Sequence, residues 1–166
     1  MRNFKIFLWI FIVLLAQTVI FSQLHLFGAV PSIVLAYVVC VMVLENEFRN
    51  AVIISIVCAA SFGALSGRGF VSMTLCYVYS SIVVFALRKK PAYVGNLPKA
   101  LFWTFLVSGA AEVIIFAQKT FTVNPEMLLY DALPTALCNT ALALIVYPLL
   151  KVTMYKGEKK KKLLIV

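Results

Sequence analysis

The sequence has very few groups that could support acid–base or metal chemistry. Its 166 residues include only six Asp and Glu and a single histidine, His25. There is no Ser/His/Asp set, no pair of carboxylates within an apolar run, no glycine-rich phosphate loop and no metal-ligand spacing. The sequence therefore predicts a protein that is not an enzyme, with no catalytic residue, no metal site and no cofactor.

The four cysteines likewise show no spacing typical of metal or redox chemistry. All four cysteines lie inside apolar runs, and no Cys-x-x-Cys pair occurs. Cysteine in such a setting behaves as a small apolar residue. We therefore interpret Cys40, Cys58, Cys76 and Cys138 as packing residues rather than as a disulfide framework.

What the chain has in abundance is apolar side chains. Hydrophobic residues make up 63% of the sequence, charged residues only 13%, and the mean hydropathy is +1.01. Soluble domains are usually about 45–50% apolar. This excess predicts an integral membrane protein folded as one compact bundle.

The clearest pattern is a hairpin at residues 51–90, around which we expect the rest of the chain to be organised. Two apolar runs, 51–65 and 70–87, flank a Ser-Gly-Arg-Gly turn, and the second run ends in Arg-Lys-Lys at 88–90. Each run is long enough, or nearly so, to cross a hydrocarbon layer of about 30 Å. The pattern predicts two spans joined by an outer turn and anchored inside by cations.

Six such runs predict an all-α fold, a bundle of six transmembrane helices. The runs are residues 6–21, 29–44, 51–65, 70–87, 101–117 and 132–150. We expect a membrane domain at residues 1–155 and a basic cytoplasmic tail at 156–166. Pro31 is expected in the first turn of the second helix, where proline is tolerated. No A-x-A-like cleavage site follows the first run, so we expect it to be retained as a helix.

The cations predict the orientation of this bundle. All 15 Lys and Arg except Arg68 and Lys119 lie on flanks that six spans would place on one side. The positive-inside bias assigns that side, with both termini, to the cytoplasm. The net charge of +9 is concentrated beside membrane runs, which predicts contact with anionic lipid rather than nucleic acid.

The predicted lipid-contacting cations are Arg88, Lys89, Lys90, Lys159, Lys160, Lys161 and Lys162. For the lysines of the tail, docking on a cytoplasmic partner is the alternative.

Small residues line one stretch of the third run. Gly63 and Gly67 form a G-x-x-x-G motif, and Ala60 precedes Ala64 at the same spacing. Small side chains let two helix backbones approach closely in lipid. The motif predicts close helix packing, either within the bundle or against a partner protein.

Polar residues within the apolar runs form a second candidate site. Glu112 is the one carboxylate inside a run, and Gln17, Thr74 and Asn139 fall in the outer halves of theirs. At about 1.5 Å per residue, Gln17, Glu112 and Asn139 reach similar depths. We expect a structural hydrogen-bond cluster, with Glu112 and Asn139 facing the interior and linked directly or through water. A substrate or ion site, or a Glu112 that reaches the outer surface, are the alternatives.

Several local patterns accompany the six runs. A polar break occupies residues 16–18, GAVPSIVL opens the second run at 28–35, and FGALSG ends the third at 62–67. The sixth run contains LPTALCNT at 133–140, followed by YPLL at 147–150. With its length and six runs, the chain resembles the MreD family of rod shape-determining membrane proteins. Family members often have an aspartate before the Ser-Gly turn. This chain has none there, so no role of that carboxylate is transferred.

The resemblance implies a scaffold of the cell-elongation and peptidoglycan-synthesis machinery in the bacterial cell membrane. Its implied partner is the single-span protein MreC, and through it the MreB filament and the peptidoglycan polymerase and transpeptidase. The family is similar in fold to the substrate-binding S components of energy-coupling-factor vitamin transporters, which gives the alternative function. S components typically carry an A-x-x-x-A pair in helix one. Here helix one is bulky and has only Ala16.

Overall fold

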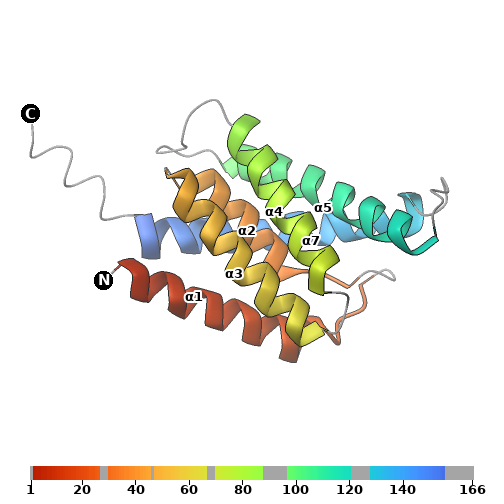
Figure 1. The fold of residues 1–166 in the computed structure, drawn as a ribbon, viewed down its shortest axis with the longest axis horizontal. Coiled ribbons are helices and arrows are strands. Elements are labelled where there is room, and N and C mark those ends of the chain that lie inside the picture. The colour runs from red at the N-terminus through yellow and green to blue at the C-terminus, as the bar shows by residue number, and fades with distance from the viewer. Residues whose placement is uncertain are drawn as a thin grey trace, which may run out of the picture.

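The computed structural model describes residues 2–26, 30–45, 47–66, 70–87, 97–120 and 128–155, and it confirms the all-α prediction (Figure 1). The described residues form six α-helices: α1 (Arg2–Ala16), α2 (Ile33–Leu44), α3 (Phe48–Ser66), α4 (Phe70–Leu87), α5 (Leu97–Thr120) and α7 (Leu133–Leu150). Three short π-helical segments adjoin them: η1 (Gln17–Phe21), η2 (Leu128–Ala132) and η3 (Lys151–Tyr155).

Among the described residues, four stretches of helix are long and apolar enough to cross a membrane. They are Phe4–Phe21, Phe48–Leu65, Leu97–Ile115 and Tyr130–Met154. Two shorter apolar helical stretches, Ile33–Leu44 and Leu75–Leu87, accompany them. Length and composition thus support a membrane protein.

The second helix begins later than the sequence predicts. Pro31 was expected in its first turn, but α2 begins at Ile33. Ser32 has extended backbone angles (φ −113°, ψ 97°), and its hydroxyl accepts a hydrogen bond from the Leu35 amide at 3.3 Å. A serine that captures a first-turn amide is a strong helix start. The prediction for Pro31 was therefore wrong, because Ser32 caps the helix and leaves the proline outside it.

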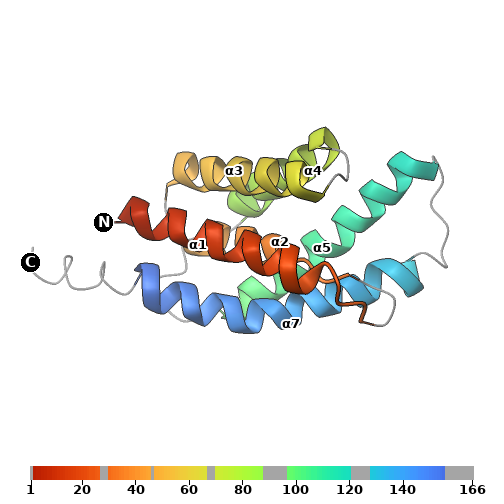
Figure 2. The same cartoon turned by 90° about the horizontal axis from the view of Figure 1, so that it is seen from below.

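Helix α2 lies at the centre of the bundle, with the α3–α4 pair on one side and α7 on the other (Figure 2). Eleven of its 12 residues are buried, and it packs against α1, α3, α4, α5 and α7. The α3–α4 hairpin packs extensively on itself but forms one side of the molecule. The organising element is therefore α2 rather than the hairpin.

The start of α1 and the end of α7 lie at the same end of the bundle (Figures 1 and 2). The Lys5 ammonium donates to the Thr153 carbonyl oxygen at 3.2 Å, and the Trp9 indole N–H donates to the Thr153 hydroxyl at 3.0 Å. These two bonds join α1 to η3. They fix the first helix beside the last one.

Candidate functional site: a polar cluster at the start of the central helix

Gln17 lies beside the chain segment that leads into α2. It is the first residue of η1 and is 3% exposed. Its amide nitrogen donates to the Pro31 carbonyl at 3.2 Å, and its amide oxygen accepts from the Ile33 N–H at 2.8 Å. Both bonds satisfy backbone groups that no helical ladder pairs. Gln17 therefore closes the non-helical start of α2 from the α1 side.

Asn139 performs the same task from α7. It is 1% exposed, and its side-chain oxygen accepts from the Ser32 N–H at 2.6 Å. Its side-chain nitrogen donates to the Ser108 hydroxyl at 2.6 Å, which ties α5 into the cluster. Gln17 and Asn139 thus meet successive backbone positions around Ser32. The sequence predicts a similar depth for these two residues. In the structure, both pair backbone groups at the start of α2.

Tyr77 of α4 is the third anchor. Its hydroxyl lies 3.0 Å from the Ser32 hydroxyl, and its ring packs on Phe62 with centroids 6.4 Å apart. Its backbone carbonyl accepts hydrogen bonds from Ser55 of α3, at 3.3 Å, and from Ser81, at 2.6 Å. One tyrosine therefore connects α4 to both α2 and α3.

Glu112 is half-buried on α5, one helical turn after Ser108. It lies near Cys76 and Tyr77 of α4. Asn139 has Ser32 and Ser108 as hydrogen-bond partners. Its amide therefore does not depend on Glu112 alone, and the direct or water-mediated link between the two stays a prediction.

The small residues of α3 lie on both the inner and the outer side of the helix. Gly63 is buried, Ala60 is half-buried and Ala64 is exposed. Close packing inside the bundle thus involves Gly63, whereas Ala64 lies on the outer surface. Gly67 lies outside the described residues.

Several other predicted residues also fall outside what the structure describes. Thr74 is in α4, but its side chain is not among those described. The predicted lipid-contacting cations outside the described residues are Arg88, Lys89, Lys90 and Lys159–Lys162.

Sequence reasoning missed three members of the cluster: Ser32, Tyr77 and Ser108. A signal existed for Ser32, because a serine directly before a long apolar run is typical of a helix N-cap. Tyr77 and Ser108 carry no such signal. Tyrosine and serine are common in membrane helices, and only packing decides which of them meet.

The cluster joins η1, α4, α5 and α7 to the start of α2. Gln17 and Asn139 are both engaged with backbone groups of the α2 start. In the part of the chain that the structure describes, no three His, Cys, Asp or Glu side chains lie close enough to hold a metal ion. The four cysteines are unpaired, and three of them are buried. The arrangement thus pairs polar groups where water is scarce.

Comparison with models of known protein families, with curated proteins and with solved structures finds no match for this chain.

Proposed function

We propose that this chain is a membrane scaffold that works by helix contacts, not by catalysis or transport. The observation that carries the proposal is the engagement of Gln17 and Asn139 with the backbone of the α2 start. These amides are the groups a transported solute would need. Because they serve the fold, the exposed helix faces are the surfaces left for function.

The specific role follows from the resemblance to the MreD family. It is a scaffold of the bacterial cell-elongation machinery in the cell membrane, in contact with a partner of the MreC type. The surface we assign to that contact is the exposed side of the small-residue stretch, at Ala64. A small exposed residue on an apolar helix permits the close approach of a second backbone.

The test compares Ala64→Leu with Gly63→Leu and with Ala141→Leu, an exposed alanine of α7. Ala64→Leu should leave membrane abundance and thermal unfolding unchanged but reduce capture of the MreC-type partner in mild detergent and disturb rod shape. Gly63→Leu should lower stability by about 1–3 kcal/mol, as overpacking typically does. Ala141→Leu, the matched control, should be silent in all assays.

The transporter alternative predicts the opposite order. It requires that Gln17→Leu or Asn139→Leu abolish function at normal abundance while the Ala64 variant is silent. Co-purification of an ATP-binding cassette pair, in place of a single-span partner, would also overturn the scaffold proposal.

The proposed topology is six spans with both termini in the cytoplasm. The proximity of α1 to η3 supports it, because an even number of crossings returns the chain to its starting side. Helix α2, with 12 residues, is only about 18 Å long. Its extended leader can nevertheless lie at membrane depth, because non-helical backbone is tolerated there when protein surrounds it.

Cysteine labelling tests this topology in a variant that lacks the four native cysteines. An impermeant maleimide on intact cells should modify Arg68→Cys and leave Gly157→Cys unmodified. The reverse result would invert the orientation, and modification of both would contradict the three spans proposed between these two positions.

A further inference from the structure

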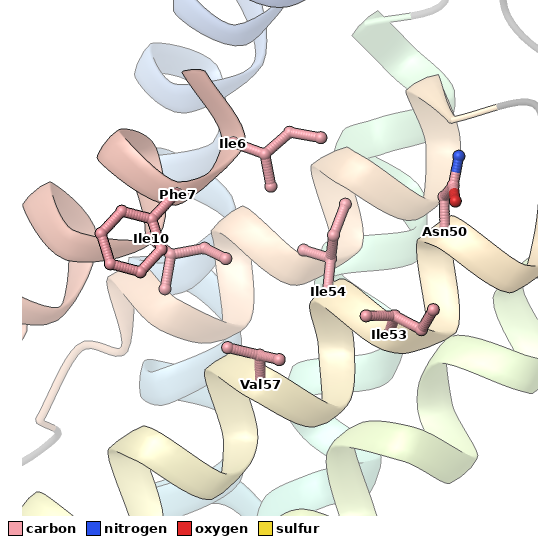
Figure 3. A pocket seen from close by; sticks show the side chains of 7 residues that line it. All are labelled: Ile6, Phe7, Ile10, Asn50, Ile53, Ile54 and Val57. Carbon is pink, nitrogen blue, oxygen red and sulfur yellow. The ribbon is translucent and has the colours of Figure 1, made fainter. Parts of the chain in front are cut away.

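An apolar groove runs between the first turns of α1 and the first turns of α3 (Figure 3). Its volume is about 330 Å³, and its lining is Ile6, Phe7, Ile10, Asn50, Ile53, Ile54 and Val57. In Figure 3, Ile6 and Ile10 of α1 point toward Ile54 of α3. Phe7, Ile53 and Val57 are 69%, 50% and 41% exposed, so the groove opens on the outside of the bundle. In the membrane, the groove is therefore accessible to lipid or to a partner protein.

The groove lies at the end of the bundle where α1 begins and η3 ends, and this end is basic. Arg49 is exposed and precedes Ile53 by four residues, which places both on one face of α3. Lys5 is exposed beside Ile6, and its ammonium donates to the Thr153 carbonyl. One exposed carboxylate is also near, since the Asn50 amide donates to Glu47 at 2.8 Å. The groove thus has an apolar lining with one exposed cation, Arg49, beside it on α3, while the Lys5 ammonium is bonded to η3.

The length of the groove limits what can fill it. Its lining on α3 extends from Asn50 to Val57, which is about 10 Å along a helix. A partner helix that crosses the membrane would need a matching surface over most of the hydrocarbon thickness of about 30 Å. An acyl chain needs only the depth of one leaflet. The groove therefore fits a lipid chain better than a spanning helix.

We infer that this groove binds one acyl chain of an anionic phospholipid from the leaflet at the basic end, with the headgroup held beside Arg49. The positive-inside bias assigns this end to the cytoplasmic leaflet, where anionic lipid attracts Lys and Arg. The inference rests on the membrane location and topology proposed above but not on the identity of the partner protein. It is also distinct from the predicted lipid contacts at residues 88–90 and 159–162.

Native mass spectrometry of the full chain in mild detergent tests this site. The probes are phosphatidylglycerol and phosphatidylcholine with identical acyl chains. We expect one phosphatidylglycerol to be retained, with phosphatidylcholine bound at least about fivefold more weakly, the effect of one cation near a membrane surface. Arg49→Gln should weaken phosphatidylglycerol binding by a similar factor. Ile53→Trp should fill the groove and remove the retained lipid.

Two matched controls accompany these variants. Lys99→Gln removes an exposed cation from α5. Ile145→Trp enlarges a residue of α7 that is 60% exposed. Neither should change lipid retention. Val57→Phe serves as a second groove-filling variant if Ile53→Trp fails to fold, and it should also remove the lipid.

Three results would overturn the inference. Equal retention of both lipids would show that charge plays no part, and unchanged retention in the folded groove-filling variants would place the lipid elsewhere. If those variants instead release a co-purified single-span protein while the lipid stays bound, the groove is a protein interface. Because the lipid is counted on purified protein, these outcomes are independent of partner capture by the Ala64 variant.

Discussion

Helices α1 and α2 are both strongly apolar, yet α1 lies at the surface of the bundle and α2 lies at its centre. In α1, Phe4, Phe7 and Phe11 are 71%, 69% and 55% exposed. In α2, Tyr37, Cys40 and Met42 are 0% exposed. A long apolar run can therefore occupy either an outer or a central position. In a membrane this is expected, because lipid tails are as apolar as the protein interior.

The two helices also differ in side-chain composition, since α1 contains Arg2 and Lys5 and α2 has no charged residue. Helix α2, IVLAYVVCVMVL, contains five valines and an alanine, and it packs on five neighbouring helices. Compact, β-branched side chains hold few rotamers and allow close approach from every side. Helix α1, RNFKIFLWIFIVLLA, has large aromatic side chains on its outer face.

The largest effect on stability is expected when side-chain volume is removed from each of the two helices in turn. Met42→Ala in α2 should destabilise the protein by about 2–5 kcal/mol, because the surrounding helices cannot fully close the cavity. The matched change in α1, Leu8→Ala, affects a residue that is 46% exposed and should stay within about 0.5 kcal/mol. Unfolding in detergent measures both values. Similar losses for the two variants would contradict the distinction between a central and an outer helix.

The second test removes the polar support of the α2 start. Asn139→Leu deprives the Ser32 N–H of its acceptor and the Ser108 hydroxyl of its donor. Leaving buried groups unpaired costs about 1–3 kcal/mol. Thr140→Val is the control, since among the described residues the Thr140 hydroxyl bonds only its own helix, at the Ala136 carbonyl. If the Asn139 variant is no less stable than the control, the cluster does not hold the helix start.

The third test uses two buried tyrosines that differ in one hydrogen bond. Tyr77→Phe removes the bond to Ser32 and should cost about 0.5–1.5 kcal/mol. Within the described residues the Tyr37 hydroxyl is buried without a hydrogen-bond partner. Tyr37→Phe should therefore be neutral or stabilising, because no bond is lost. Thermal unfolding of the pair gives the comparison, and a larger loss for Tyr37→Phe would reverse the assignment.

The smallest effect is expected where α1 is attached to η3. Trp9→Phe removes the hydrogen bond to the Thr153 hydroxyl. Such contacts between membrane helices are worth about 0.6 kcal/mol on average. A double-mutant cycle with Thr153→Val isolates this energy. A coupling above about 2 kcal/mol would show that α1 is held as firmly as the central helices.

The sequence predicted the helices well but not their arrangement. The fourth and sixth runs were placed at 70–87 and 132–150, and α4 and α7 occupy 70–87 and 133–150. Apolar runs of this length have few alternatives in a membrane, because each backbone group must be paired within its own segment. The starts of α1, α2 and α5 each differ from the predicted run by four residues, and of these only α2 begins later than predicted. There a local competition between Pro31 and Ser32 set the first residue of the helix.

The contacts of the candidate site also fall into two groups, those that the sequence indicates and those that only the structure reveals. Glutamine and asparagine within apolar runs are conspicuous, so Gln17 and Asn139 could be found from the residues alone. Their partners could not, because three of them are backbone groups of Pro31, Ser32 and Ile33, and the fourth is the hydroxyl of one serine among many, Ser108. Two polar side chains within apolar runs can be predicted to pair from the sequence. A side chain that pairs a non-helical backbone can be found only when the fold brings them together.

By itself, the sequence determined the class of protein, the helical content and which side chains are too polar to face lipid. These follow from transfer free energies and backbone hydrogen bonding, which depend on each segment separately. The tertiary structure alone decided that α2 is central, that Gln17, Asn139 and Tyr77 converge on its start, and that a groove separates α1 from α3. The physical reason is that packing between apolar helices depends on shape. Shape complementarity is a property of pairs of helices, and no single segment encodes it.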